Sequence, residues 1–172
     1  MKQKEIDKTH SAESVIDLIR KNSMTRNGIC IVAINENPLI RESFYEKLKE
    51  GLDEGSNQGK SIRYREWDFS VTRKDRTIDS LLFPNSTLDK GRMENWNRDE
   101  IKKQLCGAVR ILLNAQDLSL NSLGEKKLDM AILRDLISSH GLICVVLAPK
   151  SILSLIELDN DLNYYSSVGK IV

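Results

Sequence analysis

The stretch "GICIVAINENPLIRESF", residues 28–44, decides the fold, because an apolar run passes directly into a segment of helical character. Residues 28–34 carry no charged side chain and are rich in β-branched residues, which is typical of a strand buried on both faces. Asn37 is suited to cap a helix and Pro38 to be its first residue. This helix should face the sheet with apolar side chains at helical spacing, namely Leu39, Ile40, Phe44 and Leu48.

Other segments of the chain repeat this pattern of strand and helix. The runs "VRILLN" (109–114) and "LICVVLA" (142–148) are also apolar, and an amphipathic segment, 123–141, separates them. "SIRYREWDF" (61–69) alternates instead, which indicates a half-exposed strand near a sheet edge, and "GKIV" (169–172) begins a last strand. The alternation predicts an α/β fold with a doubly wound, mostly parallel five-stranded sheet.

One domain accounts for most of the chain. A length of 172 residues is enough for a single full core. We expect a flexible, charged tail over residues 1–10 and one α/β domain over 11–172. Within that domain, a polar stretch at about 70–96 predicts an irregular insertion.

Charge and cysteine content exclude several function classes. The 26 basic and 25 acidic residues leave a net charge of +1, which removes the usual electrostatic reason for general nucleic-acid binding or membrane-surface attachment. Cys30, Cys106 and Cys144 have no metal-ligand spacing and are typical of reduced thiols in a cytoplasmic protein. No apolar segment resembles a signal peptide or is long enough to cross a bilayer, so we expect neither.

The connection after the first strand lacks the parts of a phosphate-binding loop. Such a loop needs glycines, whose backbone N–H groups wrap the phosphates, followed by Lys and then Ser or Thr. Here Pro38 removes an N–H group and Glu36 would repel a phosphate. Arg41 and Ser43 are the only counterparts of the Lys and Ser, and we interpret them as solvent-facing helix residues.

The acids that hold magnesium and activate water are also missing. Hydrolysis requires an acid at the tip of a later strand, but the strand at 109–114 ends in Asn114, an uncharged side chain that holds magnesium poorly. Asp117 comes too late, and the next strand ends in Ala148 and Pro149. We therefore assign no catalytic residue, no metal ligand and no cofactor.

Two segments nevertheless resemble known parts of nucleotide-hydrolysing proteins. "ILLNAQDL" (111–118) resembles the Walker B strand of AAA-type proteins, in which apolar residues precede D-E-A-Q-D-L, with Leu113 and Asn114 in place of the two acids. Residues 141–172 resemble the region that carries the sensor strand, a short helix and the final strand. The chain is thus similar to the P-loop NTPase superfamily, in its degenerate AAA and STAND-like branches, over about 14–172 without the insertion.

This resemblance implies a fold and a kind of function. Relatives of this sort include the inactive N-terminal domain of some plastid and cyanobacterial AAA proteins and the STAND-like domains of bacterial conflict systems. The implied fold is a three-layer α/β/α domain with the strand at 109–114 between those at 28–34 and 142–148. The implied role is protein interaction or regulation without ATP hydrolysis.

Three aromatic residues are candidates for contact with a protein partner or an adjacent domain. Tyr164 and Tyr165 are consecutive, and we expect them beside the carboxyl edge of the sheet, either as a docking patch or packed on a helix. Trp67 lies in the alternating strand, where a partner-binding edge and a solvated strand face both remain open.

The sequence leaves three functions open. The leading hypothesis is a non-catalytic P-loop-NTPase-like module that mediates or regulates protein assembly, as part of a larger AAA or STAND-type protein. The alternative is a domain that binds ATP and magnesium through an atypical loop, with Arg41 and Ser43 near the phosphates and Asn114 near the metal. A receiver-like signalling domain is the third, and Asp68 would be its phosphate acceptor.

Overall fold

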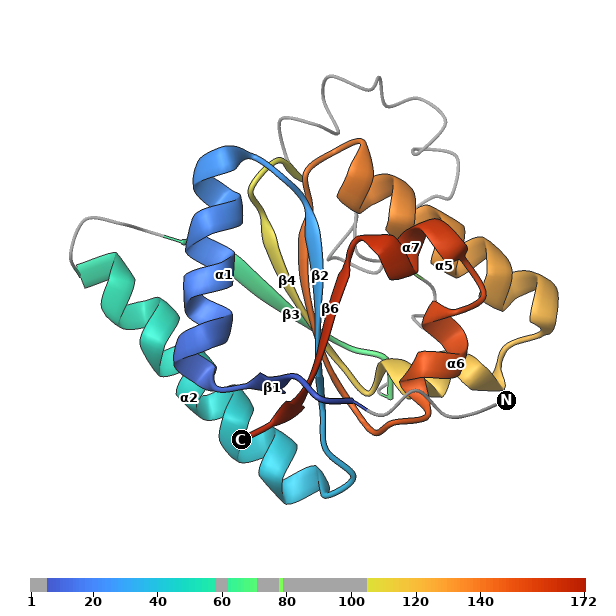
Figure 1. Cartoon of the computed structure of the whole chain (residues 1–172), viewed down its shortest axis with the longest axis horizontal. Helices are drawn as coiled ribbons and strands as arrows, with labels where there is room; N and C mark the ends of the chain where they lie inside the picture. The colour runs from blue at the N-terminus through green and yellow to red at the C-terminus, as the bar shows by residue number, and fades with distance from the viewer. Residues whose placement is uncertain (1–5, 58–61, 71–77, 79–104) are drawn as a thin grey trace.

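The computed structural model describes residues 6–57, 62–70, 78 and 105–172 (Figure 1). These residues form a six-stranded sheet in the order β1-β6-β2-β5-β4-β3, in which every pairing is parallel. The strands are β1 (Thr9–His10), β2 (Ile29–Ile34), β3 (Tyr64–Asp68), β4 (Val109–Leu113), β5 (Ile143–Ala148) and β6 (Ser166–Ile171). The helices are α1 (Ala12–Thr25), α2 (Pro38–Asn57), the 3-10 helix η3 (Ala115–Leu120), α5 (Leu123–Ser138), α6 (Ile152–Ile156) and α7 (Asn160–Tyr164).

Helices cover both faces of the sheet, which gives three layers (Figure 1). One core lies between the sheet and α1 and α2, and the other lies between the sheet and η3, α5, α6 and α7. The predicted doubly wound, parallel α/β fold is confirmed, with one strand more than the five expected. None of the helices in the described ranges is long and apolar enough to cross a membrane.

The predicted position of the strand at 109–114 is wrong. β5 lies between β2 and β4, so β4 does not contact β2 in the sheet. Burial explains this order: all six residues of β5 are buried, whereas β4 carries the half-buried Arg110 and lies one strand from the sheet edge. A run with no polar side chain is stable at the centre, where both of its edges and both of its faces are covered.

The first apolar turn of α2 points away from the sheet, contrary to the prediction. Leu39 is 72% exposed and Ile40 is 42% exposed, whereas Phe44 and Leu48 are buried as expected. The helix begins beyond the carboxyl edge of the sheet, so its first turn has no strand to cover. Farther along, Gly51 allows a close approach to α1, because a Cβ there would lie 2.1 Å from Cδ1 of Ile16.

The predicted flexible tail is wrong for its last two residues. Thr9 and His10 form β1 and pair with Lys170 and Ile171 of β6. His10 is buried, its Nε2 lies 3.0 Å from the carbonyl oxygen of Ser167, and a Cβ at Gly169 would come within 2.7 Å of its ring. A glycine beneath the imidazole therefore lets β1 reach the sheet. Residues 1–5 lie outside the described residues.

The predicted insertion at 70–96 falls almost entirely outside the described residues. Ile78 is described and buried, and its backbone N–H donates to Oδ1 of Asp129 at 3.2 Å. Asp129 lies on α5 and is itself only 5% exposed. A buried carboxylate thus accepts a backbone hydrogen bond from Ile78, the residue of the expected insertion beyond Ser70 that the structure describes.

Acidification should weaken the attachment of β1. Burial lowers the pKa of His10, and the charge of Lys8 lowers it further against the raising effect of the Ser167 hydrogen bond. Because the folded pKa is depressed, the stabilisation is fully present above the unfolded pKa of about 6.5 and is lost as the pH falls below it. Urea denaturation from neutral to mildly acidic pH should show a steeper loss of stability in the wild type than in His10→Gln. If the free energy of unfolding falls with pH equally in the two proteins, this prediction is wrong.

Candidate functional site

The carboxyl ends of the parallel strands meet at one edge of the sheet, where ligands bind in open α/β folds. β2 and β5 end level with each other, because Ile34 pairs with Ala148, and the N–H of Asn35 then donates to the Ala148 carbonyl at 3.2 Å. β4 and β3 end beside them, with Asp68 paired to Leu113. The segments that follow these four strands form the candidate site.

The connection between β2 and α2 is only three residues long, Asn35 to Asn37. Oδ1 of Asn35 accepts the N–H of Asn37 at 2.8 Å, and Oδ1 of Asn37 accepts the N–H of Leu39 at 3.0 Å. The predicted cap at Asn37 and helix start at Pro38 are confirmed. Two consecutive side-chain turns hold this connection tightly, so it has no free length with which to encircle a phosphate.

The side chain of Arg41 binds the backbone of this connection. Its Nη1 donates to the carbonyl oxygen of Asn35 at 2.7 Å and to that of Glu36 at 3.2 Å. The half-buried guanidinium therefore binds the chain's own backbone, and it is not a solvent-facing helix residue. Ser43 does face solvent, as predicted, and the described contacts do not bring it to Arg41.

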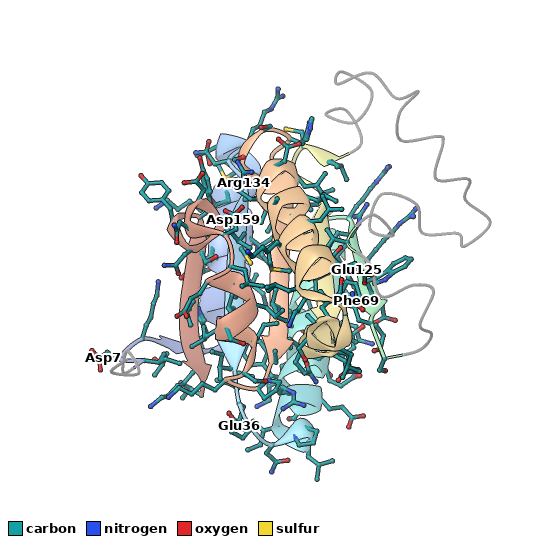
Figure 2. The ribbon with its side chains drawn as sticks, turned by 90° about the vertical axis from the view of Figure 1, so that its right-hand side faces the viewer. Asp7, Glu36, Phe69, Glu125, Arg134 and Asp159 are labelled. Atoms are coloured by element: carbon teal, nitrogen blue, oxygen red, sulfur yellow. The ribbon has the colours of Figure 1, made fainter. Side chains whose placement is uncertain are left out.

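Glu36 places a carboxylate over the same edge. Its Oε1 accepts the backbone N–H of Lys150, just after β5, at 2.9 Å. Figure 2 shows Glu36 at the end of the molecule opposite Arg134 and Asp159. The backbone N–H of Lys150 is thus already bound by an anionic side chain, and that charge repels phosphate.

The tips of β3 and β4 are joined by a polar cluster that the sequence did not reveal. Asn114 has a left-handed backbone (φ 55°), and its Nδ2 donates to Oδ1 of Asp68 at 2.9 Å. The same oxygen accepts the N–H and the hydroxyl of Ser70 at 2.9 Å and 2.7 Å. Oδ1 of Asn114 lies 3.4 Å from Nε2 of Gln116, which donates to it. The advance signal in the sequence was that Asp68 and Asn114 each stand at or near the end of an expected strand.

This cluster has the electrostatics of a closed network. Burial by itself raises the pKa of Asp68, but the hydrogen bonds from Asn114 and Ser70 outweigh it and hold the pKa below its usual value. Asn114 turns its amide nitrogen toward the carboxylate, so it satisfies Asp68 in the role that a cation would fill. Within the described ranges, no group of three or more His, Cys, Asp or Glu residues is arranged to hold a metal ion.

The two tyrosines lie at the opposite edge of the sheet from the one expected. They directly precede β6, so they stand at the amino edge of the parallel sheet. Tyr164 is 84% exposed, and its ring meets that of Tyr165 edge to face at a centroid distance of 5.4 Å. Tyr165 packs against the core beneath α5, so one ring is anchored and the other is presented to solvent.

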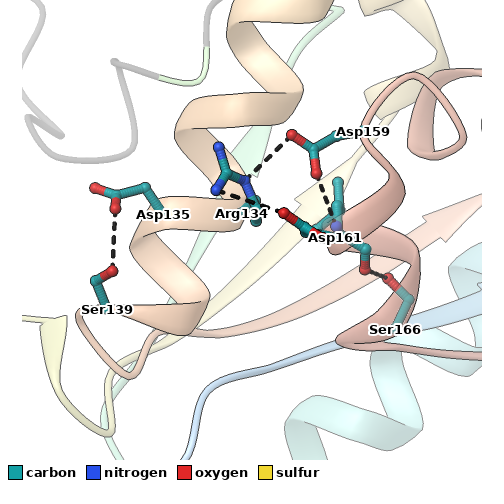
Figure 3. Close-up of polar contacts among 7 residues, drawn as sticks. Arg134, Asp135, Ser139, Asp159, Asp161 and Ser166 are labelled. Atoms are coloured by element: carbon teal, nitrogen blue, oxygen red, sulfur yellow. Dashed lines mark hydrogen bonds and ion pairs between the residues drawn. The ribbon is translucent and has the colours of Figure 1, made fainter.

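An ion-pair network fixes the short helix that carries Tyr164 (Figure 3). Nε of Arg134 on α5 lies 3.2 Å from Oδ2 of Asp159, and Nη1 lies 3.9 Å from Oδ2 of Asp161. Oδ1 of Asp159 also caps α7 by accepting the N–H of Leu162 at 2.9 Å. α7 is therefore held on α5 from its first residue.

Trp67 does not join the tyrosines. It lies on β3, which β4, β5 and β2 separate from β6 in the sheet. Its half-exposed ring packs against the core on the α5 side. The three predicted partner-binding residues therefore belong to two separate surfaces.

Comparison with known proteins connects this arrangement to ATPase folds. No protein-family model matches the sequence, and no curated protein is similar to it. Among solved structures, Drosophila ORC bound to DNA matches with a TM-score of 0.57 and 9% identity over 92% of this chain and 28% of that chain. The ORC2 protein of Aeropyrum pernix, in ADPNP–ADP complexes, matches with a TM-score of 0.60 and 10% identity over 100% of this chain and 50% of that one.

A Walker-type ATPase of Pyrococcus abyssi is also similar, with a TM-score of 0.50 and 14% identity over 98% of this chain and 56% of that chain. The chain thus spans between 28% and 56% of the length of these proteins. At such identities the likeness establishes the fold alone. This chain shares its three-layer α/β fold with these solved structures.

Removing the Arg41 side chain should destabilise the protein, because two backbone carbonyls lose a charged donor. We expect Arg41→Ala to lower the free energy of unfolding by about 1–2 kcal/mol. Chemical denaturation measures this, with Lys47→Ala, an exposed cation on the same helix, as the control. Equal losses in the two variants would show that Arg41 does not close the loop.

Proposed function

We propose that this chain is a non-catalytic P-loop-NTPase-like module that mediates or regulates protein assembly in the cytoplasm, within a larger AAA or STAND-type protein or complex. The observation that carries the proposal is the closed connection between β2 and α2. Arg41 donates to the carbonyl oxygens of Asn35 and Glu36, and the Glu36 carboxylate accepts the backbone N–H of Lys150. The fold is that of an ATPase domain, while the place for the phosphates is filled by the chain itself.

The cost of opening this connection supports a role without nucleotide. A bound triphosphate would have to displace the Glu36 carboxylate and break the contacts of Arg41 with Asn35 and Glu36. Each of these hydrogen bonds contributes about 0.5–1 kcal/mol, because all three are at least partly exposed to solvent. Together they amount to about 1.5–3 kcal/mol, which a ligand would need to recover in a loop that carries an acid and no glycine.

The side chain at the tip of β4 supports the same proposal. Asn114 stands at the tip of β4, and its amide is engaged by Asp68 and Gln116. Asp117 lies inside η3, beyond the strand tip. Phosphoryl transfer depends on charges positioned toward the substrate, whereas Arg41, Glu36 and Asp68 at this edge bind atoms of the chain itself.

Exposed apolar side chains support contact with another protein. Leu120, Leu123 and Leu128 are all exposed around the first turns of α5, and Tyr164 is exposed on α7. The leucines follow β4 and so lie toward the carboxyl edge of the sheet, whereas Tyr164 precedes β6 at the amino edge, which makes them separate apolar exposures on the same side of the domain. We assign partner binding to the α5–α7 side of the domain, with Tyr164 as the rigid, pre-positioned contact residue.

The protein should not bind ATP and magnesium. Isothermal titration should give no binding heat, and the thermal midpoint should not change. A nucleotide-binding domain would instead be stabilised by about 2.7 kcal/mol at a hundredfold excess over Kd. If such stabilisation appears and is lost in Arg41→Ala, the atypical-loop alternative is correct and this proposal is wrong.

Partner capture should depend on the exposed tyrosine. Affinity purification of the tagged protein from its native cells, followed by quantitative mass spectrometry, should recover a protein that Tyr164→Ala loses at least in large part. Lys47→Ala, on the opposite face of the sheet, serves as the control and should retain it. Identical recoveries with both variants would exclude the tyrosine from the interface.

A further inference from the structure

The edge strand β3 separates its charges by face. Tyr64 packs against the core on the α2 side, whereas Trp67 packs against the core on the α5 side. By alternation, Arg63 and Arg65 share the face of Trp67, while Glu66 and Asp68 share the face of Tyr64. The acids of this strand therefore do not neutralise its arginines on the α5 side.

A second strand adds a cation to the same face. Arg110 of β4 is in register with Arg65, so the two side chains are neighbours. Arg110 is half-buried, and its Nη1 donates to the carbonyl of Val109, the preceding residue, at 3.2 Å. In the part of the chain that the structure describes, no carboxylate forms an ion pair with either arginine.

This pair of arginines is electrostatically unfavourable as it stands. Burial lowers the pKa of Arg110, and the positive charge of Arg65 lowers it further. The neighbours on its other side are the buried thiols Cys144 and Cys30, in register across β5 and β2, which are uncharged since burial raises both of their pKa values. Two adjacent guanidiniums that have no ion pair among the described residues favour a bound anion, and planar forks of donors suit phosphate oxygens.

Trp67 gives this anion site a neighbouring aromatic surface. It lies two residues beyond Arg65 on the same face, which is about 7 Å along a strand. Arg63 lies at the same spacing on the other side of Arg65 and is exposed. Cations repeated along one strand face with an interleaved aromatic ring are a pattern that suits the phosphates and stacked bases of a single strand. A phosphopeptide would offer one phosphate and leave the repeated cations unused.

We propose that the face of β3 on the α5 side binds single-stranded nucleic acid, with a phosphodiester between Arg65 and Arg110 and a base against the exposed part of Trp67. This goes beyond the proposed assembly function and uses a different surface from both the closed loop and the tyrosines. The net charge of +1 does not oppose it, because the positive charge is local and the acids of β3 lie on the other face.

Fluorescence anisotropy with labelled oligo-dT and oligo-U of about 12 nucleotides tests the proposal. Binding should weaken as salt rises from about 50 to about 200 mM, and Arg65→Glu should weaken it by about tenfold or more and reduce the salt slope by about 1–2. Trp67→Leu should weaken binding by roughly tenfold. Arg65 is exposed, so its substitution does not threaten folding.

Lys47→Glu, which makes the same charge change at an exposed site on the opposite face, is the matched control and should bind as the wild type does. The proposal is overturned if neither oligonucleotide binds, or if Arg65→Glu and Lys47→Glu weaken binding equally. It is also overturned if a phosphoserine peptide or inorganic phosphate binds through Arg65 while the oligonucleotides do not. An unchanged Kd in Trp67→Leu would exclude base stacking and with it the choice of a nucleic acid.

Discussion

The pairing of β2 with β5 is the interaction on which the rest of the structure depends. Six in-register residue pairs join the two strands, from Ile29 with Ile143 to Ile34 with Ala148. β6 and β1 extend the sheet from β2, and β4 and β3 extend it from β5, so every other strand is placed relative to this pair. Because both strands end at the same level, Glu36 lies within reach of the Lys150 backbone. The closure of the candidate site is therefore a direct consequence of the central strand register.

The carboxyl and amino edges of the sheet differ in how their side chains are engaged. At the carboxyl edge, polar side chains are used up in short-range contacts: Asn35 and Asn37 with backbone N–H groups, and Asp68 with Asn114. At the amino edge, the ion pair of Arg134 with Asp159 fixes α7 and leaves Tyr164 projecting. In an open α/β fold the carboxyl edge is where ligands are expected. Here the polar atoms at that edge bind one another, while the amino edge keeps an apolar side chain available for contact.

The sequence predicted the fold class and every strand except β1, because burial on two faces leaves uninterrupted apolar runs such as 28–34 and 142–148. It also predicted the cap at Asn37, which is a local effect. The sequence did not predict the strand order. An apolar run indicates that a strand is buried, but it does not indicate which strands lie on either side. The exposure of Leu39 and the cluster of Asp68 with Asn114 were missed for a related reason. Both depend on where strand ends lie in space, and helical spacing or strand length alone does not contain that information.

The net charge gave no indication of the paired arginines Arg65 and Arg110, because their proximity depends on strand pairing. Arg65 and Glu66 are adjacent in sequence and cancel in any sum, yet strand alternation sends them to opposite faces. Arg110 is far away in the chain and is brought beside Arg65 only by the pairing of β3 with β4. A sheet can thus concentrate like charges from a balanced composition, because its two faces are separated by a layer of backbone. The local field at β3 is consequently set by register, and the average over 172 residues carries no information about it.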